Sequence, residues 1–264
     1  MYVLFFAVIV AYFIALAGIE SINTKKLLAV PITEKLRIKN YIRIIIGGWG
    51  ALLVIFFLSL FAGISFYDIG FRQLSFDQSL WFTITVFALC GLLFGLALYQ
   101  IIAALTSKEY QKAVIKSFGN DPNKSNYDKV IALLIPCSKK EKIAFLGVPV
   151  TAGIMEEIVA RGFLFFLLQM IFPYLSIVFV LIITSVLFGI AHIYQGVTGV
   201  IKSTLLGALF GCLYLVTGSL VPSILLHFFI DLAAVFMFPT EDNSTDAIHA
   251  HENGHGNTHK KEAK

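Results

Sequence analysis

One apolar segment carries two adjacent glutamates and an arginine: residues 153–163 read GIMEEIVARGF. An ionised carboxylate at the centre of a bilayer costs about 2.5–3.5 kcal/mol on insertion scales, so such a group normally pairs or faces a polar cavity. Glu157 and Arg161 are four residues apart, which lets an ion pair close over one helical turn. Glu156 is rotated by about 100° from Glu157 on a helix and has no basic partner at either helical spacing. We therefore expect residues elsewhere in the chain to face Glu156.

The composition around this segment is typical of a polytopic membrane protein. Of the 264 residues, 58% are hydrophobic and only 14% are charged, which is more apolar surface than one soluble domain carries. Nearly uncharged runs that are long enough to cross a hydrocarbon core of roughly 30 Å recur along the chain. They predict an all-α fold with about seven transmembrane helices, within a range of six to eight, near residues 2–19, 42–64, 80–105, 143–169, 174–193, 197–216 and 220–238.

The links between these runs differ in charge. Residues 25–43 and 107–142 are rich in lysine and arginine, whereas the link at 65–79 has no basic excess. The positive-inside rule therefore predicts an N-terminus outside the membrane and a C-terminus in the cytoplasm. Because the same rule accounts for the net charge of +4, we expect no nucleic-acid partner. Within the second basic link, residues 107–118 predict a helix on the inner membrane surface, in contact with lipid.

Two further features limit the interpretation. The tail, residues 239–264, is polar and rich in histidine, and we expect it to be disordered and outside the active site. Its histidines could bind Zn²⁺ or Ni²⁺ loosely. The three cysteines, Cys90, Cys137 and Cys212, are an odd number and imply no disulfide framework.

Few ionisable residues lie between residues 143 and 238. Apart from Lys202, which we expect at the membrane interface, they are Glu156, Glu157, Arg161, His192, His227 and Asp231. Peptide hydrolysis inside a membrane needs a water that is held and deprotonated, and a group that stabilises the oxyanion. A glutamate can act as the base, and two histidines with a carboxylate can either ligate Zn²⁺ or donate hydrogen bonds. The set therefore predicts a hydrolytic site, with or without a metal.

Structural roles are the alternative for these residues. Glu157 and Arg161 satisfy each other, so we interpret them as support for the site rather than as reacting groups. The other four would have to be separate helix-to-helix contacts on three spans, which is the weaker interpretation because ionisable groups inside a membrane are usually functional. Phe188 is expected to pack beside His192.

Three motifs on successive hydrophobic segments resemble those of the CPBP intramembrane proteases, which comprise the type II CAAX prenyl endopeptidases and bacterial Abi or bacteriocin-processing relatives. The motifs are Glu156-Glu157-x-x-x-Arg161-Gly162, Phe188-x-x-x-His192 and His227-x-x-x-Asp231. The resemblance implies a multi-helix membrane fold with a polar cavity open toward the cytosol. It divides the chain into N-terminal transmembrane helices with basic cytoplasmic loops (residues 1–135), a catalytic helical core (residues 136–238) and the tail (residues 239–264).

The resemblance also implies roles for individual residues. Glu156 would activate the water with help from His192, while His227 and Asp231 would ligand a metal or stabilise the oxyanion. The eukaryotic CAAX enzymes carry Asn at the position of Asp231, and an ionised Asp cannot donate a hydrogen bond as an Asn amide does. Asp231 is therefore expected to be a metal ligand, a partner of His227 or a protonated acid. We predict a zinc site of Glu156, His192, His227 and Asp231, and keep a metal-free mechanism open.

The predicted function is that of an intramembrane endopeptidase in the bacterial cytoplasmic membrane. By resemblance, it would cleave a lipid-anchored or amphipathic peptide near the membrane in CAAX-like processing. The alternatives are a non-catalytic membrane adaptor or bacteriocin-immunity-type protein, and a proton-coupled transporter, for which no internal repeat is visible. Straight spans would place His192 at the inner end of its helix and His227 about 10 Å from the outer end of its own. A shared site therefore requires tilted, broken or unequal helices.

Overall fold

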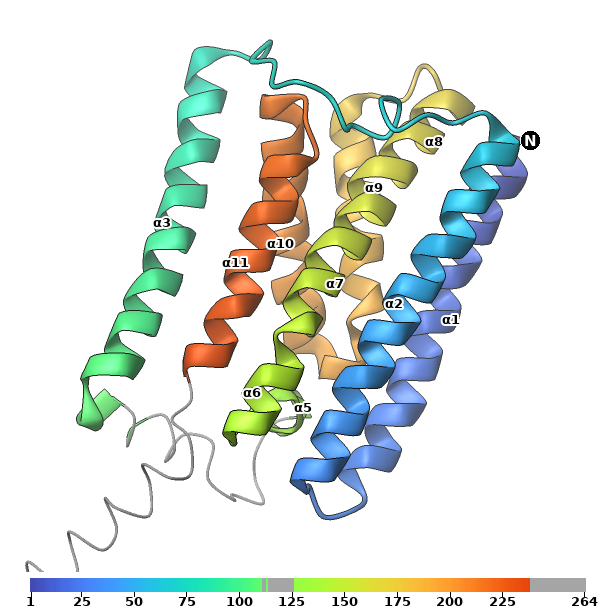
Figure 1. Cartoon of the computed structure of the whole chain (residues 1–264). Coiled ribbons are helices and arrows are strands. Elements are labelled where there is room, and N and C mark those ends of the chain that lie inside the picture. The colour runs from blue at the N-terminus through green and yellow to red at the C-terminus, as the bar shows by residue number, and fades with distance from the viewer. Residues whose placement is uncertain (111–112, 114–125, 238–264) are drawn as a thin grey trace, which may run out of the picture.

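The computed structural model describes residues 1–110, 113 and 126–237, and this part of the chain contains helices and no strand. The elements run in the following order: α1 (Tyr2–Leu28), α2 (Glu34–Ala62), α3 (Leu80–Thr106), α5 (Asn126–Leu134), α6 (Lys139–Phe145), α7 (Gly147–Glu157), the π-helix η1 (Ile158–Phe163), α8 (Leu164–Ile171), α9 (Ile177–Ala191), the 3₁₀-helix η2 (Ile193–Gln195), α10 (Gly196–Thr217) and α11 (Val221–Met237). The long helices run roughly along one common direction (Figure 1).

The helices have the length and composition of membrane spans. Five helical stretches are long and apolar enough to cross a bilayer, including the continuous stretch Lys139–Ile171, and two shorter apolar helices are Ile177–Ala191 and Val221–Ala233. These seven stretches coincide with the seven predicted runs, which confirms the prediction of an all-α integral membrane protein. The predicted surface helix at 107–118 and the tail at 239–264 lie largely outside the described residues.

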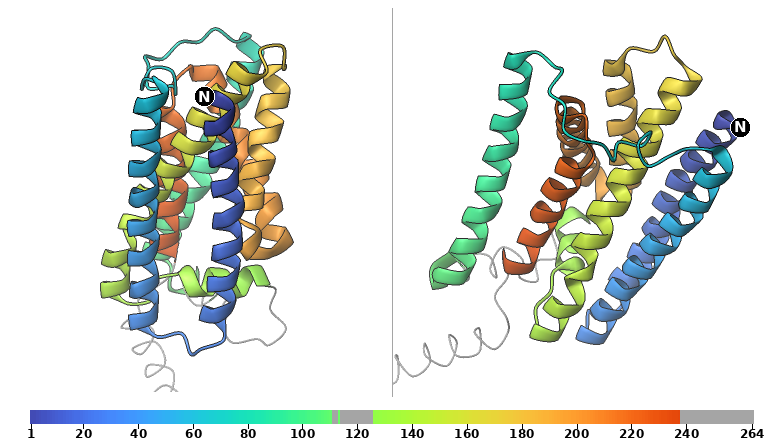
Figure 2. Two further views of the ribbon diagram at one scale, coloured as in Figure 1. Left: turned by 90° about the vertical axis from the view of Figure 1, so that its right-hand side faces the viewer. Right: turned by 45° about the horizontal axis from the view of Figure 1, so that its top comes forward.

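Helices α2, α7, α11 and α3 pack side by side in that order. α7 lies between α2 and α11, and α11 in turn packs against α3, which forms one edge of the bundle (Figures 1 and 2). The segment from η1 to α8 is enclosed by its neighbours, because Val159, Ala160, Leu164 and Leu167 have no exposed surface. The glutamate-bearing helix is thus internal to the bundle.

Helix α9 is short, with a capping residue at its start and a turn directly after its end. The Ser176 hydroxyl accepts a hydrogen bond from Val178 N at its first turn, as an N-cap residue does. After Ala191 the chain turns through η2 directly into α10, which packs along α9. The two backbones approach closely at Gly189, where a Cβ atom would collide with the Thr204 hydroxyl. His192 therefore follows a helix of 15 residues.

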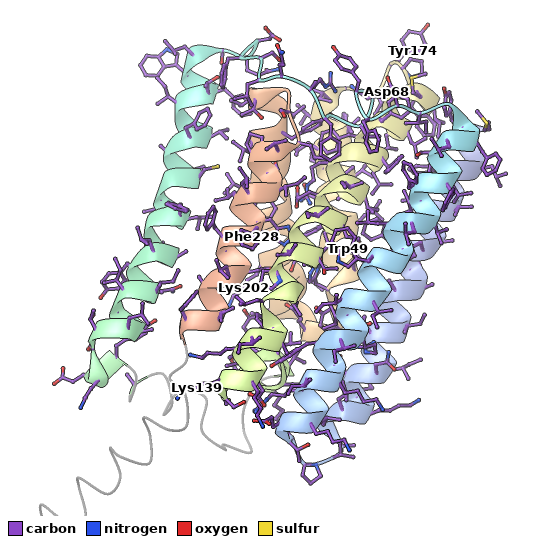
Figure 3. The ribbon with its side chains drawn as sticks, viewed as in Figure 1. Trp49, Asp68, Lys139, Tyr174, Lys202 and Phe228 are labelled. Atoms are coloured by element: carbon purple, nitrogen blue, oxygen red, sulfur yellow. The ribbon has the colours of Figure 1, made fainter. Side chains whose placement is uncertain are left out.

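The link between α2 and α3 closes one end of the bundle. Ser75 N donates to Thr217 O at 2.8 Å, and Leu220 N donates to Gly70 O at 2.9 Å. Figure 3 shows Asp68 in this link and Tyr174 at the same end of the bundle, with Lys139 at the other end. These contacts fix where α10 ends and α11 begins, and so fix the height of α11 in the bundle.

Candidate active site

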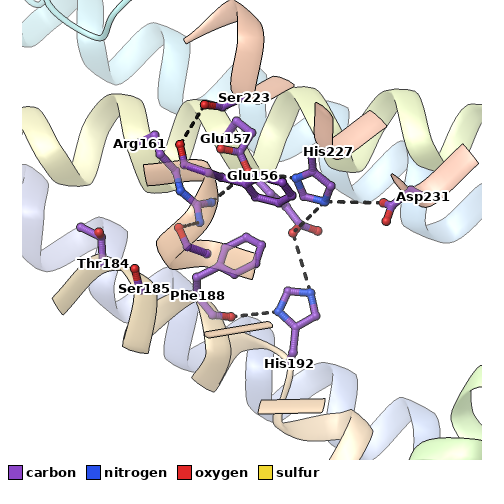
Figure 4. Close-up of polar contacts among 12 residues, drawn as sticks. Glu156, Glu157, Arg161, Thr184, Ser185, Phe188, His192, Ser223, His227 and Asp231 are labelled. Atoms are coloured by element: carbon purple, nitrogen blue, oxygen red, sulfur yellow. Dashed lines mark hydrogen bonds and ion pairs between the residues drawn. The ribbon is translucent and has the colours of Figure 1, made fainter. Parts of the chain in front are cut away.

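Glu156 is the centre of a polar cluster from three separate helical segments (Figure 4). It lies in the last turn of α7, His192 directly follows α9, and His227 lies in α11. The Glu156 Oε2 atom is 3.8 Å from His192 Nε2 and 4.0 Å from His227 Nε2. Asp231 Oδ2 lies 3.5 Å from His227 Nε2. All four residues predicted to react are therefore brought together.

Unequal helices explain how His192 and His227 meet. α9 has 15 residues and α11 has 17, so at 1.5 Å per residue they span about 22 and 26 Å, less than a hydrocarbon core of about 30 Å. The end of α9 that precedes His192 thus lies within the bundle. The two rings point at Glu156 from opposite sides (Figure 4), and the carboxylate lies between them.

Glu157 and Arg161 form the predicted ion pair, and it also holds His227. Glu157 Oε1 lies 2.9 Å from Arg161 Nη1 and 2.9 Å from His227 Nδ1. The Glu157 side chain is fully buried and that of Arg161 is 1% exposed. The guanidinium has two further contacts, because Arg161 Nη2 donates to Gly207 O at 2.7 Å and the group lies 4.4 Å from the Phe188 ring centroid.

A π-helix begins at the residue that follows Glu157. Single-turn π-helices inside α-helices are rare and are frequent at functional sites, because they change the direction in which side chains leave the helix. Here η1 carries Arg161 and separates α7, which bears both glutamates, from α8. The sequence gives no sign of it, since residues 158–163 are compatible with an ordinary α-helix.

Hydrogen bonds determine the proton positions on both imidazoles. His192 Nδ1 lies 2.9 Å from Phe188 O, and a carbonyl oxygen can only accept, so Nδ1 carries the proton. His227 Nδ1 faces a Glu157 carboxylate that is paired with Arg161 and therefore donates as well. In the neutral form of each ring, Nε2 then presents a lone pair toward Glu156.

Glu156 Oε2 is an oxygen atom that a water molecule would satisfy. The Glu156 side chain is 24% exposed, yet within the described part of the chain its Oε2 atom is buried without a hydrogen-bond partner. The separations of 3.8 and 4.0 Å to the two Nε2 atoms are too long for direct hydrogen bonds. A buried polar atom in this state is normally satisfied by ordered water or a ligand.

The zinc site is a prediction that this geometry does not strengthen. Zinc–ligand bonds of about 2.0–2.2 Å place neighbouring donor atoms of a tetrahedral site about 3.4 Å apart. The separations around Glu156 Oε2 exceed that value, and no group of three or more His, Cys, Asp or Glu among the described residues is arranged to hold a metal ion. We therefore assign no reaction step to a metal.

Two aromatic residues beside the cluster, Phe210 and Tyr194, were not predicted from the sequence. The Phe210 ring stacks on His227 with centroids 4.9 Å apart, and the Tyr194 ring stacks on His192 at 6.0 Å. Phe188 packs beside His192, as expected, at 4.9 Å. Among the 25 phenylalanines and 10 tyrosines of the chain, no spacing singles out Phe210 or Tyr194, so only the tertiary structure reveals them.

Comparison with known proteins agrees with the motifs. Residues 139–233 match the family model described as type II CAAX prenyl endopeptidase Rce1-like, and this region holds all six ionisable residues of the cluster. The match confirms the resemblance to the CPBP intramembrane proteases. No curated protein and no solved structure matched the chain significantly.

Proposed function

Because residues 139–233 match the Rce1-like family of type II CAAX prenyl endopeptidases, which are membrane proteases, we propose that this integral membrane protein is an endopeptidase. It cleaves a peptide bond near the membrane in a lipid-anchored or amphipathic peptide. The observation that carries the proposal is the buried Glu156 Oε2 atom, which has no hydrogen-bond partner among the described residues and faces His192 Nε2 and His227 Nε2. A carboxylate in this position is suited to hold a water.

The proposed reaction uses Glu156 as the general base. Glu156 takes a proton from the water, and the resulting hydroxide attacks the carbonyl carbon of the scissile peptide bond. His192, fixed by the Phe188 carbonyl, accepts a hydrogen bond from the same water at Nε2 and orients it. Glu156 then returns the proton to the leaving amine as the tetrahedral intermediate collapses. Glu157 and Arg161 hold His227 and keep the site in shape.

The substrate class follows from the family and the membrane location. A prenylated or otherwise lipid-anchored peptide is a substrate that partitions into the bilayer and reaches Glu156 from there. The excess of basic residues in the 25–43 and 107–142 links favours an orientation with these links in the cytoplasm. The bundle end that bears Lys139, opposite Asp68 (Figure 3), is then the cytoplasmic end.

The test is cleavage of an internally quenched peptide by the purified full chain in lipid nanodiscs. The peptide ends in a prenylated cysteine followed by two aliphatic residues and one terminal residue. We expect cleavage by the wild-type protein and a loss of about 10²-fold or more in Glu156→Gln, because an amide cannot take the water proton. Asp68→Asn removes a carboxylate at the far end of the bundle and serves as the matched control with unchanged activity.

Comparing the wild type with Glu156→Gln also distinguishes the proposed endopeptidase from a non-catalytic adaptor or immunity-type protein. An adaptor keeps its cellular function in Glu156→Gln, because the substitution preserves the size of the side chain. A wild-type protein that cleaves none of a set of prenylated and amphipathic peptides, together with a Glu156→Gln variant that is active in cells, would establish the adaptor instead.

A further inference from the structure

Lys202 is a positively charged residue that the proposed reaction does not use. It lies in α10, six residues after Gly196, which is about 9 Å along the helix axis. Its side chain is exposed. Figure 3 shows it between Phe228, which follows His227, and Lys139 at the end of the bundle. Lys202 thus lies between the catalytic cluster and the end of the bundle that bears Lys139.

The ammonium group of Lys202 has an aromatic neighbour but no carboxylate partner. Its Nζ atom lies 4.1 Å from the centroid of the Tyr127 ring in α5, which is a cation–π contact. Among the described residues, no Asp or Glu forms an ion pair with it. The other charged residues away from the ends of the spanning helices have partners: Glu20 with Arg43, Glu157 with Arg161, and Glu156 and Asp231 with the two histidines. A cation inside a span normally has an anionic partner or a function, so Lys202 is suited to bind an anionic ligand.

Helix α5 places this contact beside the segment that carries His192. α5 runs across the other helices near the end of the bundle that bears Lys139 (Figure 2). It packs against α10 and against η2, which directly follows His192. Two of its apolar residues, Val130 and Leu133, are 2% and 1% exposed, so the helix is packed into the bundle there. One short helix therefore contacts both Lys202 and the segment after His192.

The distance along α10 from the cluster to Lys202 matches the length of a short peptide. The Phe210 ring stacks on His227 with centroids 4.9 Å apart and marks the level of the cluster on α10. Lys202 precedes Phe210 by eight residues, which is about 12 Å of helix. If the bond after the prenylated cysteine is cleaved, three residues follow it, and an extended chain of three residues spans about 10 Å. A peptide whose scissile carbonyl lies at Glu156 can thus bring its terminal carboxylate to the level of Lys202.

We propose that the Lys202 ammonium binds the C-terminal carboxylate of the peptide substrate. The proposal rests on the proposed endopeptidase function. The ammonium donates hydrogen bonds to the carboxylate oxygens, while the face of the Tyr127 ring holds the ammonium in place. Lys202 thereby selects a peptide that ends three residues after the scissile bond. It acts on substrate binding and takes no part in the bond cleavage.

The test compares two prenylated, internally quenched peptides that differ only in the terminal group, which is a carboxylate or a carboxamide. With the full chain in nanodiscs, we expect kcat/KM of the wild type to be about 10-fold or more higher for the acid, because hydrogen bonds between charged groups are the stronger ones. Lys202→Met keeps an unbranched side chain without the charge. It should lower kcat/KM for the acid to the value for the amide, through KM, and leave the amide unchanged. Lys202→Arg should retain the preference for the acid.

Lys140→Met is the matched control. Lys140 is also an exposed lysine, in the first turn of α6, so its replacement removes the same charge from the protein. This variant should retain the preference for the acid. An equal loss of preference in Lys140→Met and Lys202→Met would indicate a general attraction of the anionic peptide to a basic surface, and would overturn the role of Lys202.

The amide peptide separates this proposal from the proposed endopeptidase function. A wild type that cleaves both peptides with the same kcat/KM would overturn the role of Lys202 and leave the endopeptidase function standing. A Lys202→Met variant that loses the same factor on both peptides would show that Lys202 contacts lipid headgroups or supports the fold, and would also overturn its role. A wild type that cleaves neither peptide overturns both proposals.

Discussion

Glu157 and His227 are joined across two helices, because Glu157 Oε1 lies 2.9 Å from His227 Nδ1. The same oxygen lies 2.9 Å from Arg161 Nη1, so one buried carboxylate fixes both an imidazole and a guanidinium. The two adjacent glutamates therefore have different surroundings. Glu157 is fully buried and paired through Oε1, whereas the Glu156 side chain is 24% exposed and its Oε2 atom lies between the Nε2 atoms of the two histidines.

Glu157→Gln should destabilise the protein as well as slow it. The substitution leaves the Arg161 charge buried without a counterion, and breaking one partner of a buried pair typically costs about 3–5 kcal/mol. His227 also loses the charged acceptor that sets its tautomer, so we expect kcat to fall. Chemical unfolding in detergent and the peptide cleavage assay measure the two effects.

Glu20→Gln is the control for that experiment. Glu20 accepts two hydrogen bonds from Arg43, at 2.7 and 2.9 Å, but the two side chains are 20% and 37% exposed, so removing this carboxylate should cost less than breaking a fully buried pair. An equal loss of stability in Glu20→Gln and Glu157→Gln would contradict the assignment of Glu157 as the structural centre of the site.

Unlike Glu157→Gln, His192→Ala should lose activity but keep the stability of the wild type. Among the described residues, its one side-chain hydrogen bond goes to Phe188 O in the preceding helix, and the side chain is 16% exposed. We expect the free energy of unfolding to change by about 1 kcal/mol or less. The rate should fall by about 10²-fold or more, because Nε2 no longer orients the water. Stability and kcat falling together would instead indicate a structural histidine.

The membrane-spanning helices could be predicted from the sequence, because each of them is a long apolar run. The seven predicted runs coincide with helical stretches of the structure. What hydrophobicity cannot specify is the relative height of the helices. Residues 174–193 predict one continuous span, but the helix ends at Ala191 and η2 follows. That end of the helix, together with the α2–α3 link that holds Leu220 against Gly70, lets His192 and His227 reach Glu156.

The ionisable residues of the site were predictable for a similar reason: charge is rare in spans, so each instance stands out. Their partners were not, because they are common residues. Arg161 Nη2 donates to the backbone carbonyl of Gly207, and carbonyls carry no sequence signal. Phe210 and Tyr194 lie among many other aromatic residues, and their stacking on the imidazoles follows from helix packing alone.

The predicted zinc site can be tested separately from the tail. His249, His251, His255 and His259 are replaced by asparagine, and zinc and cleavage are measured on the same sample. The proposed reaction uses Glu156 without a metal, so we expect cleavage to survive dialysis against a chelator. About one zinc per chain, lost together with activity in His227→Ala, would establish the metal site instead.

Gly207→Ala should damage the site although Gly207 bears no side chain. A Cβ atom there would lie 2.9 Å from Arg161 Nη2 and 3.2 Å from Phe188 Cδ1. Arg161 cannot move aside freely, because it is buried and bound to both Glu157 and the Gly207 carbonyl. Overpacking of this kind costs about 1–3 kcal/mol. The displaced guanidinium should disturb Glu157 and, through it, His227, so kcat should fall as well.

Gly95→Ala in α3 is the matched control, because an added Cβ atom at Gly95 would meet nothing within 4 Å. Alanine is preferred over glycine inside helices by up to about 1 kcal/mol, so this variant should be as stable as the wild type or slightly more so. The comparison isolates the contact with Arg161 from the general effect of a methyl group in an apolar helix. If Gly207→Ala also kept full stability and activity, the added methyl group would not displace Arg161, and the predicted effect of this contact on Glu157 and His227 would be wrong.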